Sequence, residues 1–252
     1  MGSEFRADRL YLSISVGRQP MKLSIIIPCY NEKESLIELI SLVKKSPVKE
    51  KEIILVDDGS DDGSTELIRD CLEIEVDKVV FHDKNMGKGA AIRSALKFVT
   101  GDMVIIQDAD IEYDPQEYPK LMAPVLEGKA DVVYGSRFSG EGPHRVHLFW
   151  HYVGNRLLTI LSNMLTNLNL SDMETCYKLF KTGIIKGISL RENGFGIEPE
   201  ITAKIAKTKC RIYETGISYY GRSYEEGKKI NWKNGLGAIF AIIKYGLFTR
   251  FQ

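Results

Sequence analysis

The sequence predicts an α/β protein with a Rossmann-like fold, in which a mostly parallel central sheet is flanked by helices. Short apolar segments alternate with helical patterns through the first 140 residues, and each apolar segment ends in polar residues. A chain of 252 residues, 44% hydrophobic and 27% charged, suits one globular domain. Ligands of open parallel sheets bind where strands end at their carboxyl side, so we expect the polar endings to share one cleft.

Five strands are predicted in this half, over residues 23–28, 52–56, 78–82, 103–107 and 132–134. Continuous apolar runs of this length are typical of parallel strands that are buried on both faces. Helices are predicted between them, after Asn31, over residues 64–72, and from a glycine-rich segment to Phe98.

In the second half of the sequence, the patterns predict longer helices and a basic loop. Helical patterns cover residues 147–168 and 197–206, residues 210–217 suit a strand, and residues 221–233 suit a polar, basic loop. The aromatic residues near the start of the first of these helices are interpreted as packing residues. A final amphipathic helix is expected within residues 234–252. Its apolar face consists of Leu236, Ile239, Phe240, Ile243 and Leu247. Residues 1–20 are interpreted as a tag or leader outside the fold.

Composition excludes several classes of protein. Acidic and basic residues balance at 34 each, which argues against a nucleic-acid-binding protein. The four cysteines lack metal-ligand spacing and are interpreted as free thiols. We find no signal peptide, and no apolar stretch reaches the roughly 20 residues that span a bilayer. We therefore expect a cytoplasmic protein.

Asp108-Ala109-Asp110, which follows the fourth predicted strand, is the strongest chemical signal. Divalent cations such as Mg²⁺ take oxygen ligands, typically one or two carboxylates together with substrate phosphates. The alternative interpretation is a turn with two exposed acids. The motif therefore indicates a metal site only when neighbouring motifs support it.

Three further segments follow predicted strands. Tyr30 lies where an aromatic ring can stack on a base, and Asp58 where a carboxylate can bind a base or ribose. The alternatives are a helix cap at Asn31 and a simple turn at Asp58-Gly59. The segment NMGKG can bring backbone N–H groups and Lys88 close to phosphates, but it lacks both the Walker spacing and the complete dinucleotide fingerprint.

Together these segments resemble a known family. SIIIPCYNE, ILVDDGSDDGS, NMGKGAA, QDADIEYDP and YGSRF, in this order, resemble family 2 of the inverting glycosyltransferases. DMETCYKLF, GFGIEPEITAKI and YYGRSYEEGKKINW look like the branch that includes dolichyl-phosphate mannose synthase and bacterial polyprenyl-phosphate glucosyltransferases. The resemblance implies a GT-A catalytic domain over residues 21–233 and the transfer of a hexose from a nucleotide-sugar.

The resemblance also implies roles for individual residues. The donor, a UDP- or GDP-hexose, is expected to contact Pro28, Tyr30, Glu32, Asp58, Lys88 and Asp108. Mg²⁺ or Mn²⁺ is expected on Asp108, Asp110 and Glu112, the last at a position where mannose synthases often have glutamine. The acceptor phosphate is expected on Arg137, Arg145 and Arg222. The residues expected to serve catalysis are Asp172, Arg137 and Arg222.

The acceptor stays open between two classes, and the role of Asp172 depends on it. A hydroxyl acceptor needs a general base, for which Asp172 and Glu174 are candidates. A polyprenyl or dolichyl phosphate is already anionic, and these acids then position Arg137 or the sugar. The basic loop and DMETCYKLF favour the lipid phosphate. A non-catalytic sugar-nucleotide-binding protein is a third hypothesis, which the intact carboxylates oppose.

Attachment to a membrane is the last expectation. Relatives in this branch commonly carry transmembrane helices after the catalytic domain, whereas this sequence ends at Gln252. Either such a region was removed, or the protein binds the cytoplasmic face of the membrane peripherally. Basic residues between Arg222 and Arg250, next to the amphipathic helix, favour peripheral binding.

Overall fold

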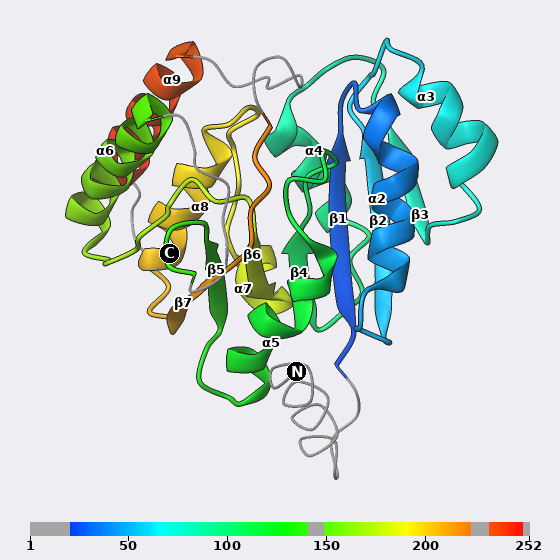
Figure 1. The fold of residues 1–252 in the computed structure, drawn as a ribbon. Helices are drawn as coiled ribbons and strands as arrows, with labels where there is room; N and C mark the ends of the chain where they lie inside the picture. The colour runs from blue at the N-terminus through cyan, green and yellow to red at the C-terminus, as the bar shows by residue number, and fades with distance from the viewer. Residues whose placement is uncertain (1–20, 141–148, 223–231, 249–252) are drawn as a thin grey trace.

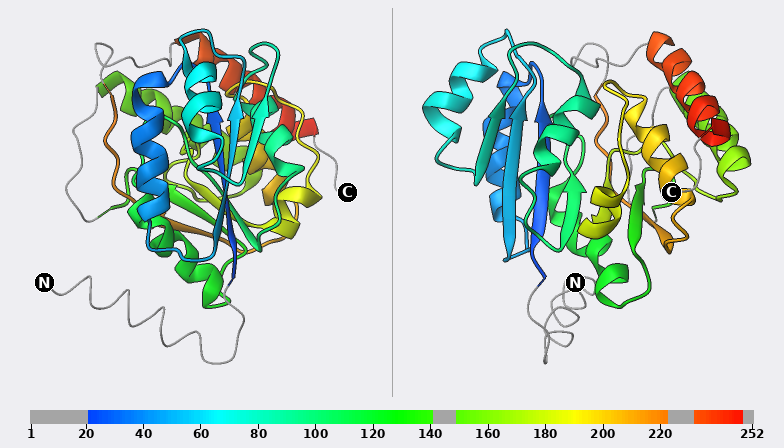
Figure 2. Two further views of the ribbon diagram at one scale, coloured as in Figure 1. Left: turned by 90° about the vertical axis from the view of Figure 1, so that its right-hand side faces the viewer. Right: turned by 180° about the vertical axis from the view of Figure 1, so that it is seen from behind.

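The computed structural model describes residues 21–140, 149–222 and 232–248 (Figure 1). Its centre is a seven-stranded sheet with helices on both faces, as Figure 2 shows from two further sides. In spatial order the strands are β3 (Lys78–Phe81), β2 (Lys51–Asp57), β1 (Leu23–Cys29), β4 (Met103–Ile106), β6 (Lys178–Lys181), β5 (Val132–Ser136) and β7 (Ile212–Gly216). The predicted α/β fold with a mostly parallel sheet is therefore confirmed.

The register of β1 brings the strand endings together. β1 pairs in parallel with β2 and with β4, so that Cys29 lies opposite Asp57 and Ile26 opposite Ile106. β6 runs antiparallel to both β4 and β5. This strand was not predicted, because it has four residues and begins and ends with lysine, which hides its strand character. β7 pairs in parallel with β5.

Helices cover both faces of the sheet. They are α2 (Lys33–Lys45), α3 (Ser64–Leu67), the π-helical turn η1 (Ile68–Leu72), α4 (Lys88–Leu96), the 3-10 turn η2 (Pro115–Glu117), α5 (Tyr118–Leu126), α6 (Phe149–Thr166), α7 (Thr182–Gly187), α8 (Ile197–Ala206) and α9 (Trp232–Phe248). Alternate residues of β1 enter two cores, Ile25 with α2 and α5, and Ile26 with α4 and α8. Both faces are buried, as the continuous apolar runs predicted. The short helices α5 and α7 were not predicted.

The C-terminal helix α9 is part of this fold rather than an addition to it. It lies beside α6 and α8, and it buries Ala238, Ala241, Ile242 and Tyr245 (Figure 1). Gly246 permits close packing against α6, because a Cβ atom there would lie 2.8 Å from Leu165 Cβ. The predicted apolar face is a different one and is exposed, with Leu236, Ile239, Phe240, Ile243 and Leu247 all between 38% and 67% accessible. Within the described ranges, no helix has both the length and the apolar character to cross a bilayer.

Candidate active site

A cavity of about 940 Å³ lies at the carboxyl ends of the strands, where the sequence predicted a cleft. Most of the predicted site residues line it, namely Pro28, Tyr30, Glu32, Asp58, Lys88, Asp108, Asp110, Glu112, Arg137 and Arg222. Asp172 lies behind this wall and is fully buried. Arg145 and most of the predicted basic loop lie outside the described residues.

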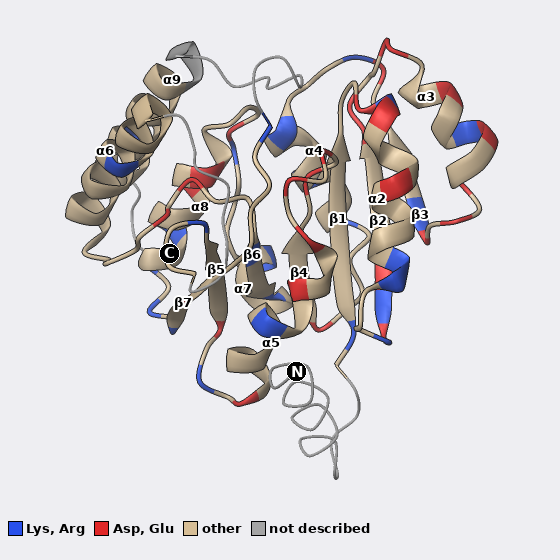
Figure 3. Cartoon of the chain, viewed as in Figure 1, with Lys and Arg blue, Asp and Glu red and all other residues tan. Residues whose placement is uncertain are grey.

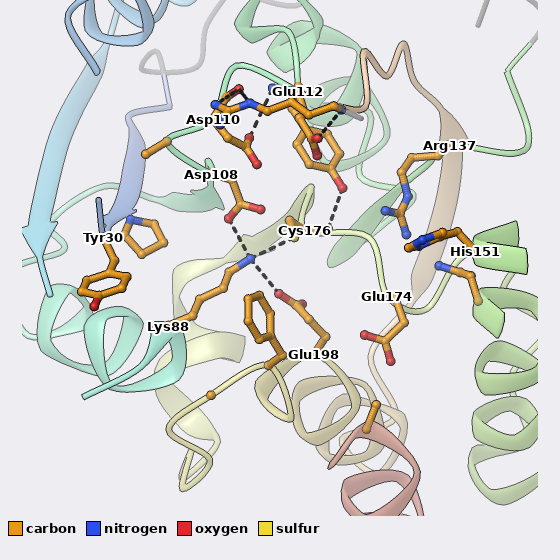
Figure 4. A pocket seen from close by; sticks show the side chains of 18 of the residues that line it. Tyr30, Lys88, Asp108, Asp110, Glu112, Arg137, His151, Glu174, Cys176 and Glu198 are labelled. Atoms are coloured by element: carbon orange, nitrogen blue, oxygen red, sulfur yellow. Dashed lines mark hydrogen bonds and ion pairs between the residues drawn. The ribbon is translucent and has the colours of Figure 1, made fainter. Parts of the chain in front are cut away.

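Asp58 anchors the glycine-rich segment at one end of the cavity. Its Oδ1 lies 2.7 Å from His82 Nδ1 and accepts a hydrogen bond from Met86 N at 2.9 Å, and its Oδ2 accepts one from Gly87 N at 2.7 Å. The turn interpretation also holds, because Gly59 has a φ of 70° and a Cβ there would lie 2.4 Å from the Lys84 backbone. Tyr30 is 37% exposed beside this end (Figure 4).

Backbone N–H groups of this segment were expected to contact phosphates, which stays a prediction, and in this structure the protein itself uses several of them. Met86 and Gly87 donate to Asp58, while Gly89 N and Ala90 N donate to Asn193 O at 2.6 and 3.3 Å. The carbonyl of Asn193 thereby takes the place at the N-terminus of α4 that an anion could occupy. From this segment, the Lys88 side chain is the cationic group at the cavity.

The segment that contains Asn193 also holds α9. The Glu192 carboxylate accepts hydrogen bonds from Lys244 Nζ and Tyr245 Oη, each at 2.8 Å. Its main-chain carbonyl accepts one from Arg93 of α4. Glu192 and Asn193 therefore connect the C-terminal helix to the N-terminal turn of α4.

Lys88 forms the centre of a buried charge network. Its Nζ lies 2.7 Å from Asp108 Oδ1 and 3.2 Å from Glu198 Oε1, and it donates to Cys176 Sγ at 2.9 Å (Figure 4). Burial opposes the charge, but Asp108 and Glu198 outweigh it and hold the pKa of Lys88 well above its usual range. Glu198 also pairs with the fully buried Lys178.

Glu198 was not singled out from the sequence, although a signal exists. In the predicted helix over residues 197–206, Glu198 lies on the same face as Ile201 and Ile205, three and seven positions later. All three are buried. A charged residue on the apolar face of a helix requires a buried partner, which here is a lysine from each of two other elements.

The three predicted metal ligands lie at the cavity but are engaged differently. Asp108 pairs with Lys88, and Glu112 accepts hydrogen bonds from Tyr219 Oη at 2.5 Å and from Arg222 N at 2.6 Å. Burial, followed by repulsion from Asp108 and Glu112, raises the pKa of Asp110 to about 8. In the described part of the chain, no three Asp, Glu, His or Cys side chains form a ready-made ligand set.

Asp108 and Asp110 nevertheless fit a divalent cation that a substrate shares. Such an ion needs one or two carboxylates from the protein when phosphate oxygens supply other ligands. The raised pKa of Asp110 reflects burial and crowded negative charge, and a bound cation would balance that charge. Glu112, which is held by Tyr219 and Arg222, fits a supporting role better than that of a ligand.

Arg137 is held in one orientation by Asp172. Its Nε and Nη2 atoms each lie 2.7 Å from a different carboxylate oxygen, and its backbone N donates to the same carboxylate at 3.1 Å. Asn155 donates to Asp172 Oδ1 at 3.2 Å. Burial would raise the pKa of Asp172, but Arg137 outweighs it and lowers that pKa. Asp172 is therefore an ionised residue that positions Arg137, which itself lines the cavity.

Arg222 lies with the acidic residues rather than with Arg137. Both of its terminal nitrogens lie 3.1 Å from Glu32 Oε2, and its Nε donates to the carbonyl of Asp110 at 3.0 Å. Tyr219 separates the two arginines, because its ring lies 5.2 Å from the Arg137 guanidinium carbon while its hydroxyl binds Glu112. Arg137 and Arg222, which were predicted to share one phosphate, thus line the same cavity but are held by different partners.

The opposite end of the cavity is apolar. Trp150 and Leu158 of α6 and Ala238 of α9 line it. Glu174 also lines the cavity and lies near Arg137 and His151 (Figure 4). Burial, followed by repulsion from Glu198 and Asp172, outweighs the opposing attraction of Lys178 and Arg137 and raises the pKa of Glu174 to about 7.

Comparison with known proteins matches residues 24–188 to the family model described as Glycosyl transferase family 2. Among curated proteins, the chain is similar to the undecaprenyl-phosphate 4-deoxy-4-formamido-L-arabinose transferase of Aeromonas hydrophila, with 31% identity over 211 residues. The match covers 82% of this chain but 62% of that protein, so the chain spans less than two thirds of its relative's length.

Solved structures share the fold. Glucosyl-3-phosphoglycerate synthase from Mycobacterium tuberculosis, in complex with Mn²⁺, uridine diphosphate and phosphoglyceric acid, aligns with a TM-score of 0.72 at 18% identity. The alignment covers 97% of this chain and 84% of that one. The same enzyme with Mg²⁺ and uridine diphosphate gives a TM-score of 0.69 at 18% identity, with the same coverage. The expected GT-A fold is therefore confirmed.

The raised pKa of Glu174 predicts a pH-dependent effect of Glu174→Gln on stability. Between the ordinary pKa of 4.5 and the native value of about 7, the folded protein retains a proton that the unfolded chain releases. Wild-type stability therefore falls across this window, by up to about 3 kcal/mol at full ionisation. The Glu174→Gln substitution removes this loss, because an amide does not ionise. We expect urea unfolding to show a stabilised variant above about pH 7.5 and little difference below about pH 4.5.

Glu192→Gln is the matched control with the opposite sign. Burial alone would raise the pKa of Glu192, but hydrogen bonds from Lys244 and Tyr245 lower it. The ionised form is thus favoured in the folded state, and its stabilisation is lost as the pH falls through the native pKa. Glu192→Gln should lower the free energy of unfolding near neutral pH and change it less in acid. If Glu174→Gln changed the free energy of unfolding equally at both pH extremes, the raised pKa of Glu174 would be contradicted.

Proposed function

The chain belongs to glycosyl transferase family 2, and from that premise we propose that it is a divalent-cation-dependent, inverting hexosyltransferase that acts on a polyprenyl phosphate. Its curated relative is named as a transferase to undecaprenyl phosphate, which supports this class of acceptor. The single observation that carries the proposal is the pairing of Arg137 with Asp172. This pairing fixes a cation at the cavity and removes a candidate base from it.

The choice of acceptor follows from proton chemistry. A hydroxyl group must lose a proton when it attacks, and a general base has to lie within reach of it. Asp172 is fully buried and already accepts hydrogen bonds from Arg137 and Asn155. A phosphate monoester is largely anionic near neutral pH and needs an oriented cation instead. The Arg137 guanidinium, with two nitrogens fixed by Asp172, suits that requirement.

For the donor, we propose that the nucleoside lies at the Tyr30 end and the diphosphate near Lys88. The exposed ring of Tyr30 can stack on a base, and Pro28 and Asp58 line the same end. Lys88 stays charged because Asp108 and Glu198 favour its ammonium form. Asp108 and Asp110 would hold Mg²⁺ or Mn²⁺, which supplies charge neutralisation to the leaving diphosphate.

In the transfer step, an oxygen of the lipid phosphate bonds to the anomeric carbon while the bond from that carbon to the nucleoside diphosphate breaks. Attack from the opposite face inverts the anomeric centre. Arg137 orients the attacking phosphate, and Lys88 stabilises the charge that develops on the leaving group. Arg222, held near Asp110 and Glu32, is placed to assist the leaving group rather than the acceptor.

We further propose that α6 and α9 bind the cytoplasmic face of a membrane. The two helices lie side by side and expose large apolar residues, and Figure 3 shows them with few charged positions. On α6 these are Phe149, Trp150, Tyr152, Leu157, Ile160 and Met164, and on α9 they are Leu236, Ile239, Phe240, Ile243, Leu247 and Phe248. This surface continues from the apolar end of the cavity, so a lipid tail can stay in the bilayer while its phosphate reaches Arg137.

A hydroxyl acceptor is the second candidate, and one observation favours it. Glu174 lines the cavity with a pKa of about 7, which suits a general base. Under this alternative the donor chemistry is unchanged. The acceptor would be a saccharide hydroxyl.

The metal prediction concerns Asp110. Sugar transfer is expected to stop in excess EDTA and to return with Mn²⁺ or Mg²⁺, and Asp110→Asn should reduce kcat/KM by at least about 100-fold because an amide cannot balance the ion's charge. Glu112→Gln, the matched control, should lose less than about 10-fold, since the glutamine oxygen can still accept from Arg222 N and its NH2 group can donate to the Tyr219 hydroxyl. Full activity in EDTA would contradict metal dependence.

The acceptor prediction concerns Asp172. Asp172→Asn should lower kcat/KM for a short-chain polyprenyl phosphate by about 30- to 100-fold, because the loss of a charged hydrogen-bond pair costs about 2–3 kcal/mol. The KM for the nucleotide-sugar should change little. Arg137→Lys should behave alike, since lysine keeps the charge but not the fork. Transfer to a soluble sugar but to no lipid phosphate would establish the hydroxyl alternative.

The membrane prediction uses exposed residues of α9. The double change Phe240→Ser with Leu247→Ser should lower the partition coefficient onto anionic phospholipid vesicles by at least about 10-fold at both low and high salt, because each side chain contributes about 1.5–3 kcal/mol when buried. Ile74→Ser is the control, since Ile74 is 90% exposed but follows η1, away from α6 and α9. Equal co-sedimentation of both proteins would refute the assignment of this surface.

A further inference from the structure

Glu174 presents a carboxyl group that the rest of the protein leaves unused. It follows Asp172 and Met173 in the segment before β6, and its side chain points into the cavity (Figure 4). Within the described residues its Oε1 atom is buried and has no hydrogen-bond partner. A buried acceptor without a partner costs about 1–3 kcal/mol, so such a group is retained where a ligand completes it.

Glu174 lies near the place that the transferred sugar would occupy if the function proposed above is correct. Lys88 and Asp108 mark the diphosphate end, and Glu198 joins that end to the Glu174 side of the cavity (Figure 4). Arg137, which we assign to the acceptor, lies on the same side of the cavity as Glu174 and is one of its charged neighbours (Figure 4). The sugar must lie between its leaving diphosphate and the attacking phosphate, and Glu174 lines the cavity as a neighbour of both Glu198 and Arg137.

The charged neighbours restrict which ligand group Glu174 can bind. Glu198 of α8 and Asp172 repel a negative charge on it, whereas Lys178 of β6 and Arg137 attract one, and the pKa lies near 7. At neutral pH both protonation states are therefore present. A phosphate can pair well with the protonated form alone, and an ammonium with the ionised form alone. A sugar hydroxyl both donates and accepts, so it suits either form.

We propose that Glu174 is a specificity-determining residue for the transferred sugar and that its carboxyl group hydrogen-bonds a ring hydroxyl of the hexose. Rotation of the side chain gives Oε1 the partner that it lacks in the free protein. The same carboxyl group disfavours entry of the acceptor phosphate, which is directed to Arg137. A sugar that lacks the matching hydroxyl leaves the carboxyl group unpaired and is discriminated against.

The test separates binding of the sugar from binding of the nucleotide. Calorimetric titrations with Mn²⁺ would compare UDP-glucose with UDP, and GDP-mannose with GDP, on the full chain. For the pair that binds, Glu174→Ala should weaken the nucleotide-sugar by at least about 10-fold and the nucleoside diphosphate by less than about 2-fold. Glu174→Gln should recover part of the loss, because an amide both donates and accepts. Glu66→Ala is the control, since Glu66 is an exposed carboxylate on α3 outside the cavity.

Deoxy analogues of the same nucleotide-sugar identify the hydroxyl. Loss of the hydroxyl at one ring position should lower the affinity of the wild type by about 10-fold or more, but that of Glu174→Ala by less than about 3-fold. Removing the hydroxyl and removing the Glu174 side chain delete the same contact, so their effects do not add. An unchanged penalty in the variant for every ring position would overturn the proposal. Equal weakening of nucleotide-sugar and nucleoside diphosphate in Glu174→Ala would likewise overturn it, in favour of a structural role.

Two further outcomes separate this inference from the proposed function. If Glu174→Ala loses kcat while its affinity for the nucleotide-sugar is unchanged, Glu174 is a base and the inference is wrong. If the sugar-specific loss occurs but the wild type transfers only to soluble hydroxyls, the inference holds and the lipid acceptor is wrong. If the wild type binds none of the four ligands, both the inference and the proposed function are wrong.

Discussion

The buried ion network around Lys88 constrains the whole centre of the molecule. Through Asp108 and Glu198 it ties the first turn of α4 to the end of β4 and to α8, and through Lys178 it reaches β6. Charges removed from water are tolerated when each has a close partner of opposite sign, so these elements cannot separate without stranding a charge. The same pairing keeps a cation at the cavity. Stability of the centre and readiness of the site therefore depend on one set of contacts.

Sequence patterns predicted the parallel part of the fold well, because each strand of that part is apolar on both faces and ends in polar residues. They missed β6, where pairing with β4 and β5 overrides a weak local preference and buries Lys178 completely. Local patterns also placed most donor-site residues at the cavity. They could not separate Arg137 from Arg222, because that separation depends on Tyr219 and on partners distant in the sequence. For the same reason, the sequence did not predict that the carbonyl of Asn193 accepts hydrogen bonds from Gly89 N and Ala90 N.

The cavity combines a charged and an apolar environment. Its charged end concentrates carboxylates and lysine, whereas its other end is bounded by α6 and α9, which expose apolar side chains on their outer surface. α9 packs inward through one face, with Ala238, Ala241, Ile242 and Tyr245, and its other large apolar residues lie on the outside. A substrate with an anionic head and a hydrocarbon tail matches this division, and a wholly polar one would leave the apolar end in contact with water. The shape of the site thus agrees with the acceptor favoured by the Arg137–Asp172 pair.

The contacts of Glu192 and Asn193 connect α9 mechanically to the donor end of the cavity. Glu192 is fastened to α9 at Lys244 and Tyr245, while the neighbouring Asn193 carbonyl closes the start of α4, one residue from Lys88. A tilt of α9 would therefore act on the turn before Lys88 through these few hydrogen bonds. Coupling between two binding events is reciprocal. If binding to a bilayer raises the affinity for the donor through this segment, binding of the donor raises the affinity for the bilayer by the same factor. Enzyme loaded with nucleotide-sugar and empty enzyme would then divide differently between membrane and solution.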